Sequence, residues 1–319
     1  MFKNVFKQVA ILLMSCVCVY SWAQTYPTKS IRLVVPMEPG SPTDAIARLI
    51  AQKLTSSLGQ SVVVDNRASV NGIIGTDMVA HAPADGYTLL AGNSGTHAMN
   101  PGLYKKLNYD PVKDFEAVAQ IVTSPLVLMG SKHFAAHTVA ETIAAAKHGS
   151  LHFAIPGATA QLASLMFNSM ASVDIVSIPY KGSSGAETAL LSGDAQLLFA
   201  SISNALPYVK SGRMNAIAVS SPKRSPALPD VPTLNESGVP GFEIEYWVGL
   251  FAPAGTPAAI VDRLNSEVGK VLGSANVRDH IQQMGYSTAP NIKAEFGMYV
   301  KRSVERNTKL MRELGVVAQ

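Results

Sequence analysis

Short apolar runs alternate with amphipathic stretches along most of the chain. The runs are rich in β-branched residues and have the length of buried strands; they lie at 31–35, 62–64, 88–91, 127–129, 152–155, 175–178, 197–199 and 216–219. Helical spacing of apolar residues follows the first run, at Ile46, Leu49, Ile50 and Leu54, and recurs at 139–147, 161–170, 185–191 and 205–209. Strands that alternate with helices in this way predict βαβ units, parallel sheets and an α/β fold.

The C-terminal part of the chain has a different pattern. Two longer amphipathic helices are predicted at 258–272 and 292–311, each with apolar residues on one side. Pro and Gly are frequent between the elements, but no internal repeat, low-complexity tract or clean linker is present. This organisation predicts two lobes joined by crossing segments, rather than independent domains on a string.

The first 23 residues have the pattern of a secretory signal. Lys3 and Lys7 precede an apolar run at 9–19, and small residues before position 24 predict cleavage after Ala23. The run is shorter than the roughly 20 residues of a membrane span, so an uncleaved anchor is the weaker interpretation. A lipoprotein is weaker still, because apolar sequence continues beyond Cys16. The sequence therefore predicts a mature protein that works outside the cytoplasm.

The composition of the mature chain excludes several kinds of site and partner. Cys16 and Cys18 are the only cysteines and both precede the predicted cleavage point, which leaves no disulfide, thiol nucleophile or cysteine metal site. Without Lys3 and Lys7, the mature chain has 24 basic and 22 acidic side chains. It contains no run of basic residues of the kind that would indicate a nucleic-acid partner. No second apolar stretch is long enough to span a membrane.

A loop at residues 36–44, between the first predicted strand and helix, is a candidate binding element. Ser41 suits a helix N-cap, Pro42 the first helical position, and Asp44 can reach back in the manner of a capping box. Gly40 permits close approach of the backbone to a ligand. Free N–H groups at a helix start favour a carboxylate or phosphate. An ordinary capped turn is the alternative interpretation.

Two further loops follow predicted strands. Residues 156–161 are small and polar and precede a helix, and residues 92–96 offer several hydrogen-bond donors. Each could be a simple turn, but ligands of α/β folds bind beyond the carboxyl ends of strands. Three such loops in one exported chain indicate a binding site more strongly than any one of them.

Motifs for catalysis are missing from the sequence. It contains no nucleophile elbow, zinc-protease helix, phosphate loop or dinucleotide fingerprint. His133 and His137 could share a metal on one helix face, but no third ligand is evident, and a surface pair is favoured. Lys181, in Tyr180-Lys181-Gly182, could act as a base, although a solvated lysine on a lobe-crossing segment is the preferred interpretation. We therefore expect no enzyme activity, metal or cofactor.

A series of motifs in fixed order carries a family resemblance. They are Val35-Pro36, Pro39-Gly40, Asp44 and Ala47-Arg48; Val64-Asp65-Asn66-Arg67, Gly72 and Gly75; residues 84–90; Asn100-Pro101 and Leu103-Tyr104; Tyr109-Asp110-Pro111 and Asp114-Phe115; residues 179–182; and residues 223–225, 228–233 and 252–257. With them the chain resembles the Bug family, the extracytoplasmic receptors of tripartite tricarboxylate transporters, over about 26–315.

The resemblance implies a type II periplasmic-binding-protein fold. Two lobes, at 24–122 plus 226–319 and at 123–225, would each contain a mainly parallel β-sheet flanked by helices, with a ligand cleft between them. The lobes would close on a small molecule, usually a carboxylate, and the loaded monomer would dock on a membrane permease. A periplasmic partner of a sensor kinase is the alternative, and an exported hydrolase is a more distant one.

Family ligands are held mostly by backbone N–H groups, hydroxyls and water. Carried onto this chain, the resemblance and the loops predict ligand contacts at Gly40, Ser41, Thr43, Asp44, Asn93, Ser94, Gly157, Ala158, Thr159, Gln161 and Ser201. Within this set, Asp44 is expected to order its loop rather than touch an anion. Gln161 is expected either to cap its helix or to point into the cleft.

Several positions depart from the family pattern. Pro42 follows Ser41 where a second glycine is usual, Pro156 lies in a shortened second loop, and Ala200 replaces a frequent acidic residue. Glu38 stands where the family has a small or apolar residue. If Glu38 faces the cleft, it would repel a second carboxylate or pair with a ligand amine; if it faces solvent, it has no such role.

Overall fold

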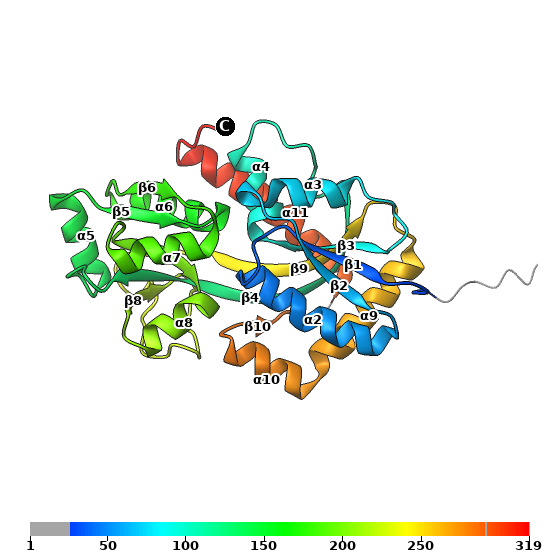
Figure 1. The fold of residues 1–319 in the computed structure, drawn as a ribbon. Coiled ribbons are helices and arrows are strands. Elements are labelled where there is room, and N and C mark those ends of the chain that lie inside the picture. The colour runs from blue at the N-terminus through cyan, green and yellow to red at the C-terminus, as the bar shows by residue number, and fades with distance from the viewer. Residues whose placement is uncertain (1–25, 291, 319) are drawn as a thin grey trace, which may run out of the picture.

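Two β-sheets share one long strand, β4 (Phe115–Ser131), in the computed structural model of the protein. Residues 115–125 of β4 pair with β9 (Glu245–Pro253), and from Leu126 onward β4 pairs with β7 (Leu197–Ser201). The structure describes residues 26–290 and 292–318, so the predicted signal sequence lies outside the described residues. A lobe is built around each sheet, and β4 and β9 run between the two lobes (Figure 1).

The first sheet has the strand order β2-β1-β3-β9-β4, with β10 on β4. Its remaining strands are β1 (Ile31–Val35), β2 (Val62–Asn66), β3 (Thr88–Asn93) and β10 (Ser287–Thr288). The helices and helical turns of this lobe are α2 (Pro42–Leu58), η1 (Val70–Gly72), α3 (Ile73–Ala80), the π-helical turn η2 (Gly95–Met99), α4 (Asn100–Leu103), α9 (Ala258–Gly273), α10 (Ala275–Gln283) and α11 (Lys293–Glu313).

The second sheet is built around the C-terminal half of β4. There, β4 has β8 (Met214–Val219) on one side and β7 on the other, followed by β5 (His152–Ile155) and β6 (Val176–Pro179). Its helices are α5 (Val139–His148), α6 (Ala158–Ala171), α7 (Gly182–Ser192) and α8 (Ile202–Lys210).

Alternation along the strands divides the core between the two faces of each sheet. In β1, Leu33 packs in one cluster with Ile46 of α2 and Leu264 of α9, whereas Val34 packs in another with Phe296 of α11. The second sheet is divided in the same way. Its Phe153 lies with α6, and Ala154 lies with α7 and α8 on the opposite face.

The predicted strands and helices are all present, but the pairing is more mixed than expected. Parallel pairing holds among β1, β2 and β3 and among β5, β6 and β7, whereas every pair made by β4 or β9 is antiparallel. Periodicity identifies a strand but not its direction, and the crossing strand β9 was not predicted at all. The α/β fold class is confirmed as a mixed sheet with flanking helices.

One local expectation was wrong, and another holds in its favoured form. Tyr180-Lys181-Gly182 does not cross between lobes, because it forms the turn from β6 to α7 inside the second lobe. His133 and His137 are both exposed, as the favoured surface pair predicts, although they lie in the segment before α5 and not on a helix. Among the described residues, no helix has both the length and the apolar character needed to cross a bilayer.

Candidate functional site

Three helices of the second lobe begin at the same edge of its sheet. Strands β5, β6 and β7 are parallel, and α6, α7 and α8 follow them directly, so the three helix N-termini gather beyond the carboxyl ends of the strands. The N-cap residues Gly157, Lys181 and Ser201 provide no side-chain cap to these helices. Each start contacts the first lobe, so this edge is the junction between the lobes.

The start of α6 meets the loop after β3. The hydroxyl oxygens of Ser94 and Thr159 lie 2.9 Å apart, and both side chains are buried. Gly95 brings its backbone close to Ala158: a Cβ added there would lie 3.7 Å from the Ala158 methyl group. The structure therefore brings together two of the predicted loops, one from each lobe. It also shows that residues 158–161 form the first turn of α6 rather than a loop.

Thr43 and Asn93 belong to a buried network behind this contact. The Asn93 amide donates to the Thr43 hydroxyl at 2.9 Å, and that hydroxyl lies 2.6 Å from the Tyr246 hydroxyl. The Asn93 side-chain oxygen accepts from the backbone N–H of Thr96 at 3.0 Å. Burial raises the pKa of Tyr246, so its hydroxyl stays protonated and available as a donor. These side chains already have partners within the lobe, so they hold the two loops in place.

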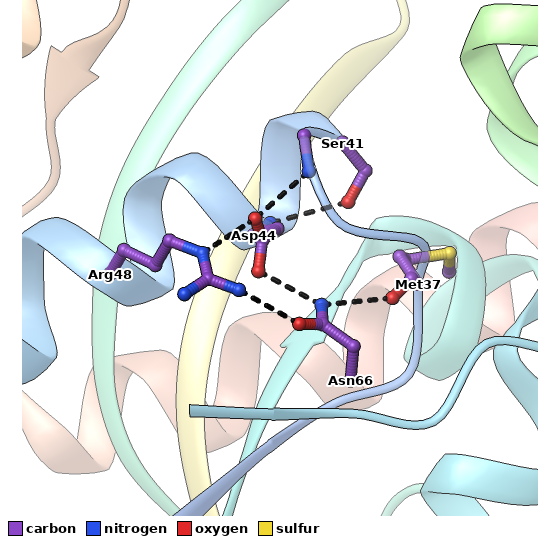
Figure 2. Close-up of polar contacts among 6 residues, drawn as sticks. Met37, Ser41, Asp44, Arg48 and Asn66 are labelled. Atoms are coloured by element: carbon purple, nitrogen blue, oxygen red, sulfur yellow. Dashed lines mark hydrogen bonds and ion pairs between the residues drawn. The ribbon is translucent and has the colours of Figure 1, made fainter. Parts of the chain in front are cut away.

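Asp44 is the centre of a second network, shown in Figure 2. Its carboxylate accepts from the Gly40 backbone N–H at 2.9 Å, Arg48 Nε at 2.8 Å and Asn66 Nδ2 at 2.8 Å. Ser41 caps α2 by accepting from the Asp44 N–H at 3.3 Å. Burial raises the pKa of Asp44, but the hydrogen bonds from Arg48, Gly40 and Asn66 outweigh it and leave the pKa lowered. Asp44 thus orders its loop and occupies the Gly40 N–H.

Ser201 and Gln161 complete the predicted set. The Ser201 hydroxyl lies 3.1 Å from that of Ser203, which in turn lies 2.7 Å from the hydroxyl of Tyr286 in the first lobe. Gln161 lies in the first turn of α6 and is half-buried. Because no side chain caps α6, Gln161 does not serve as its cap.

Sequence reasoning missed Tyr246, Tyr286 and the buried His97. The His97 ring stacks on Phe251 with centroids 3.9 Å apart, and its Nδ1 lies 2.9 Å from the Thr96 hydroxyl. Burial lowers the pKa of His97 to about 3, so the imidazole is neutral. His97 therefore supports the Asn93–Thr96 turn from behind, and no local sequence signal marks it.

Because His97 is neutral in the folded protein, we expect the free energy of unfolding to depend on pH. Below pH about 6.5 the unfolded chain takes up a proton at this histidine and the folded chain does not, so the free energy of unfolding falls by about 1.4 kcal/mol per pH unit. Between pH 7 and 5, wild type should lose about 2 kcal/mol more than His97→Phe in denaturant titrations. Replacement of the exposed His280 by asparagine is the control. Parallel pH profiles for wild type and His97→Phe would contradict the assignment.

Comparison with known proteins places this arrangement in a family. Residues 46–316 match the family model described as tripartite tricarboxylate transporter family receptor. BugT of Bordetella pertussis is 34% identical over 92% of this chain and 91% of its own length. An R. palustris protein solved with adipate is 34% identical, has a TM-score of 0.89 and matches 92% of this chain and 100% of its own. MatC from Rhodopseudomonas palustris with bound malate is 33% identical, with a TM-score of 0.85 and coverages of 89% and 99%.

Proposed function

The chain belongs to the receptor family of tripartite tricarboxylate transporters, the Bug-type periplasmic solute-binding proteins. From that premise we propose that it captures a small carboxylate between its lobes and delivers the ligand to a membrane permease. Two relatives of similar length are known with dicarboxylic acids bound, adipate in one and malate in the other. They support a carboxylate as the ligand class of this chain.

The observation that carries the proposal is the start of α6. The first N–H groups of a helix have no acceptor within it, and here no side chain supplies one. These donors and the positive end of the helix dipole favour an anion. The Ser94 and Thr159 hydroxyls lie beside them, one from each lobe. A carboxylate at Gly157, Ala158 and Thr159 would therefore touch both lobes and stabilise their closed arrangement.

We propose two lobes, 24–122 with 226–319 and 123–225, and the pairing of β4 supports a boundary near residue 123. The stretch before β9 differs from the proposed bounds, because Phe242 stacks on Phe199 and Leu234 donates to Val219 in the second lobe. Strand β4 exchanges β9 for β7 between Pro125 and Leu126. When the lobes close, they would rotate about this point of β4 and about the second connection between them, the segment from β8 to β9. We place the remaining predicted contacts, Ser41 and Ser201, at the edges of the ligand, and Thr43, Asp44 and Asn93 behind it.

We propose that the mature protein is periplasmic, which its family and the predicted signal support. In cells that export the protein, the mature form should begin at Gln24. Mass spectrometry of the purified periplasmic protein measures this directly. A chain that keeps its first 23 residues would contradict cleavage after Ala23.

A carboxylate ligand should stabilise the native state by mass action. At ten times its dissociation constant it adds about 1.4 kcal/mol, a rise of about 3–5 °C in melting temperature for a chain of this size. We expect this shift from at least one member of a screen of mono- and dicarboxylates, amino acids and aromatic acids. Native mass spectrometry of freshly purified protein is the companion measurement. A flat screen together with an empty native mass would sink the carboxylate proposal.

A further inference from the structure

Glu38 of the first lobe reaches across the junction to the start of α7. Its carboxylate oxygen Oε1 accepts from the backbone N–H of Ser183 at 2.7 Å. Gly182, with φ of +74°, lies directly under the carboxylate, where an added Cβ would overlap the carboxyl group of Glu38. Only glycine admits this approach. The N-terminus of α7 therefore already holds an anion, and that anion belongs to the protein.

A second carboxylate lies close to Glu38. Glu187 of α7 is half-buried and accepts from Asn204 and, at 3.1 Å, from the Tyr208 hydroxyl. Burial raises the pKa of Glu187, and the charge of Glu38 adds to the rise. The nearest basic residue along the chain, Lys181, is exposed, where solvent screens its charge. This end of the junction is therefore electrostatically unfavourable for any further anion.

The start of α6 has the opposite character. It presents backbone donors and two hydroxyls, those of Ser94 and Thr159, with no side-chain cap. Helices α6 and α7 lie on opposite faces of the sheet but begin at the same edge. A ligand that spans the junction thus meets an anion-binding end at α6 and an anion-bearing end at α7.

We propose that Glu38 determines ligand specificity: the receptor takes a ligand with a single carboxylate and a neutral or cationic far end, and rejects dicarboxylates. This inference rests on the proposed function. A dicarboxylate would place its second charge beside Glu38 and Glu187, where like charges disfavour each other and the Ser183 N–H is already used. An ammonium group would instead pair with the Glu38 carboxylate.

Two pairs of ligands matched in length test the inference: succinate with 4-aminobutanoate, and adipate with 6-aminohexanoate. Calorimetric titration gives each dissociation constant for wild type, Glu38→Gln and Glu38→Ala. Wild type should favour the amino acid of each pair at least tenfold. Both variants should shift the ratio of constants about tenfold toward the dicarboxylate. Glu116→Gln, which removes an exposed glutamate of β4, is the matched control and should leave the ratio unchanged.

Other outcomes overturn one proposal or both. A wild type that prefers the dicarboxylates, or a Glu38→Gln variant that weakens all four compounds equally, excludes the specificity role while leaving carboxylate binding intact. Equal weakening would mean that Glu38 only holds the lobes together. No binding of any of the four compounds to wild type or to either variant would overturn the specificity role for straight-chain ligands, whereas the carboxylate ligand class is overturned by the flat screen and empty native mass described above.

Discussion

Replacement of Ala158 by proline is expected to weaken carboxylate binding by about 100-fold and to leave the fold intact. Ala158 is the first residue of α6, a position where proline is well tolerated because its N–H has no acceptor in the helix. Gly157 before it is extended, with φ 172° and ψ 179°, as a residue before proline must be. The substitution therefore removes one ligand donor and leaves the helix in place. A hydrogen bond to a charged group contributes about 1.5–3 kcal/mol, and the ring also crowds the anion.

Titration calorimetry measures the affinity, and the melting temperature without ligand reports on the fold. Ala275→Pro is the matched control, since Ala275 is the exposed first residue of α10 in the first lobe and also follows an extended residue. The control should bind as wild type does. If Ala158→Pro kept its affinity, the α6 start would not be the carboxylate site, whatever the melting temperatures were.

Asp44→Asn is expected to destabilise the protein by about 3–5 kcal/mol. Three donors converge on the carboxylate, from Gly40, Arg48 and Asn66. An amide has only one acceptor oxygen, so its NH₂ group must face a donor in a site where Asp44 is 2% exposed. The amide oxygen can keep the bonds from Gly40 and Arg48, which both donate to Oδ2, but the bond from Asn66 to Oδ1 is lost. The two retained bonds also lose their charged acceptor, and a hydrogen bond to a charged group contributes about 1.5–3 kcal/mol. A fall of about 10 °C in melting temperature follows for a chain of this size.

The pH dependence identifies the carboxylate as the cause. Because the folded pKa of Asp44 is lowered, its contribution is present above the ordinary aspartate pKa of about 3.9 and is lost as pH falls through the lowered value. The stability difference between wild type and Asp44→Asn should therefore be largest near neutral pH and shrink in acid. Asp230→Asn, at an exposed position, is the control. A difference that did not change with pH would mean that packing, not charge, explains the loss.

Local signals predicted the first loop well. Ser41, Pro42 and Asp44 follow one another in the order that starts a helix, and the structure has Ser41 as the N-cap of α2. Asp44 reaches back as predicted, but to the Gly40 N–H and not to that of Ser41, as a full capping box would. These contacts span at most four residues, so the sequence contains all the information needed. The strands were predicted correctly for the same reason, because the apolar run that identifies each one is local.

The contacts between the lobes could not be predicted in this way. Ser94 meets Thr159, Glu38 meets Ser183, and Ser203 meets Tyr286, over separations of 65, 145 and 83 residues. Each depends on how two sheets are placed, which no periodicity encodes. The role of Glu38 accordingly stayed open between cleft and solvent until the position of α7 was known.

The position of β9 also determines the order in which the protein can fold. In the first sheet β9 lies between β3 and β4, yet it is made from residues 245–253, which begin 130 residues after Phe115 opens β4. Until that segment arrives, β3 has an unpaired edge, and exposed edges are templates for aggregation. The second lobe has all its strands by residue 219 and is free of this dependence. Chains truncated before β9 should therefore have a folded second lobe and an incomplete first lobe that is prone to aggregation.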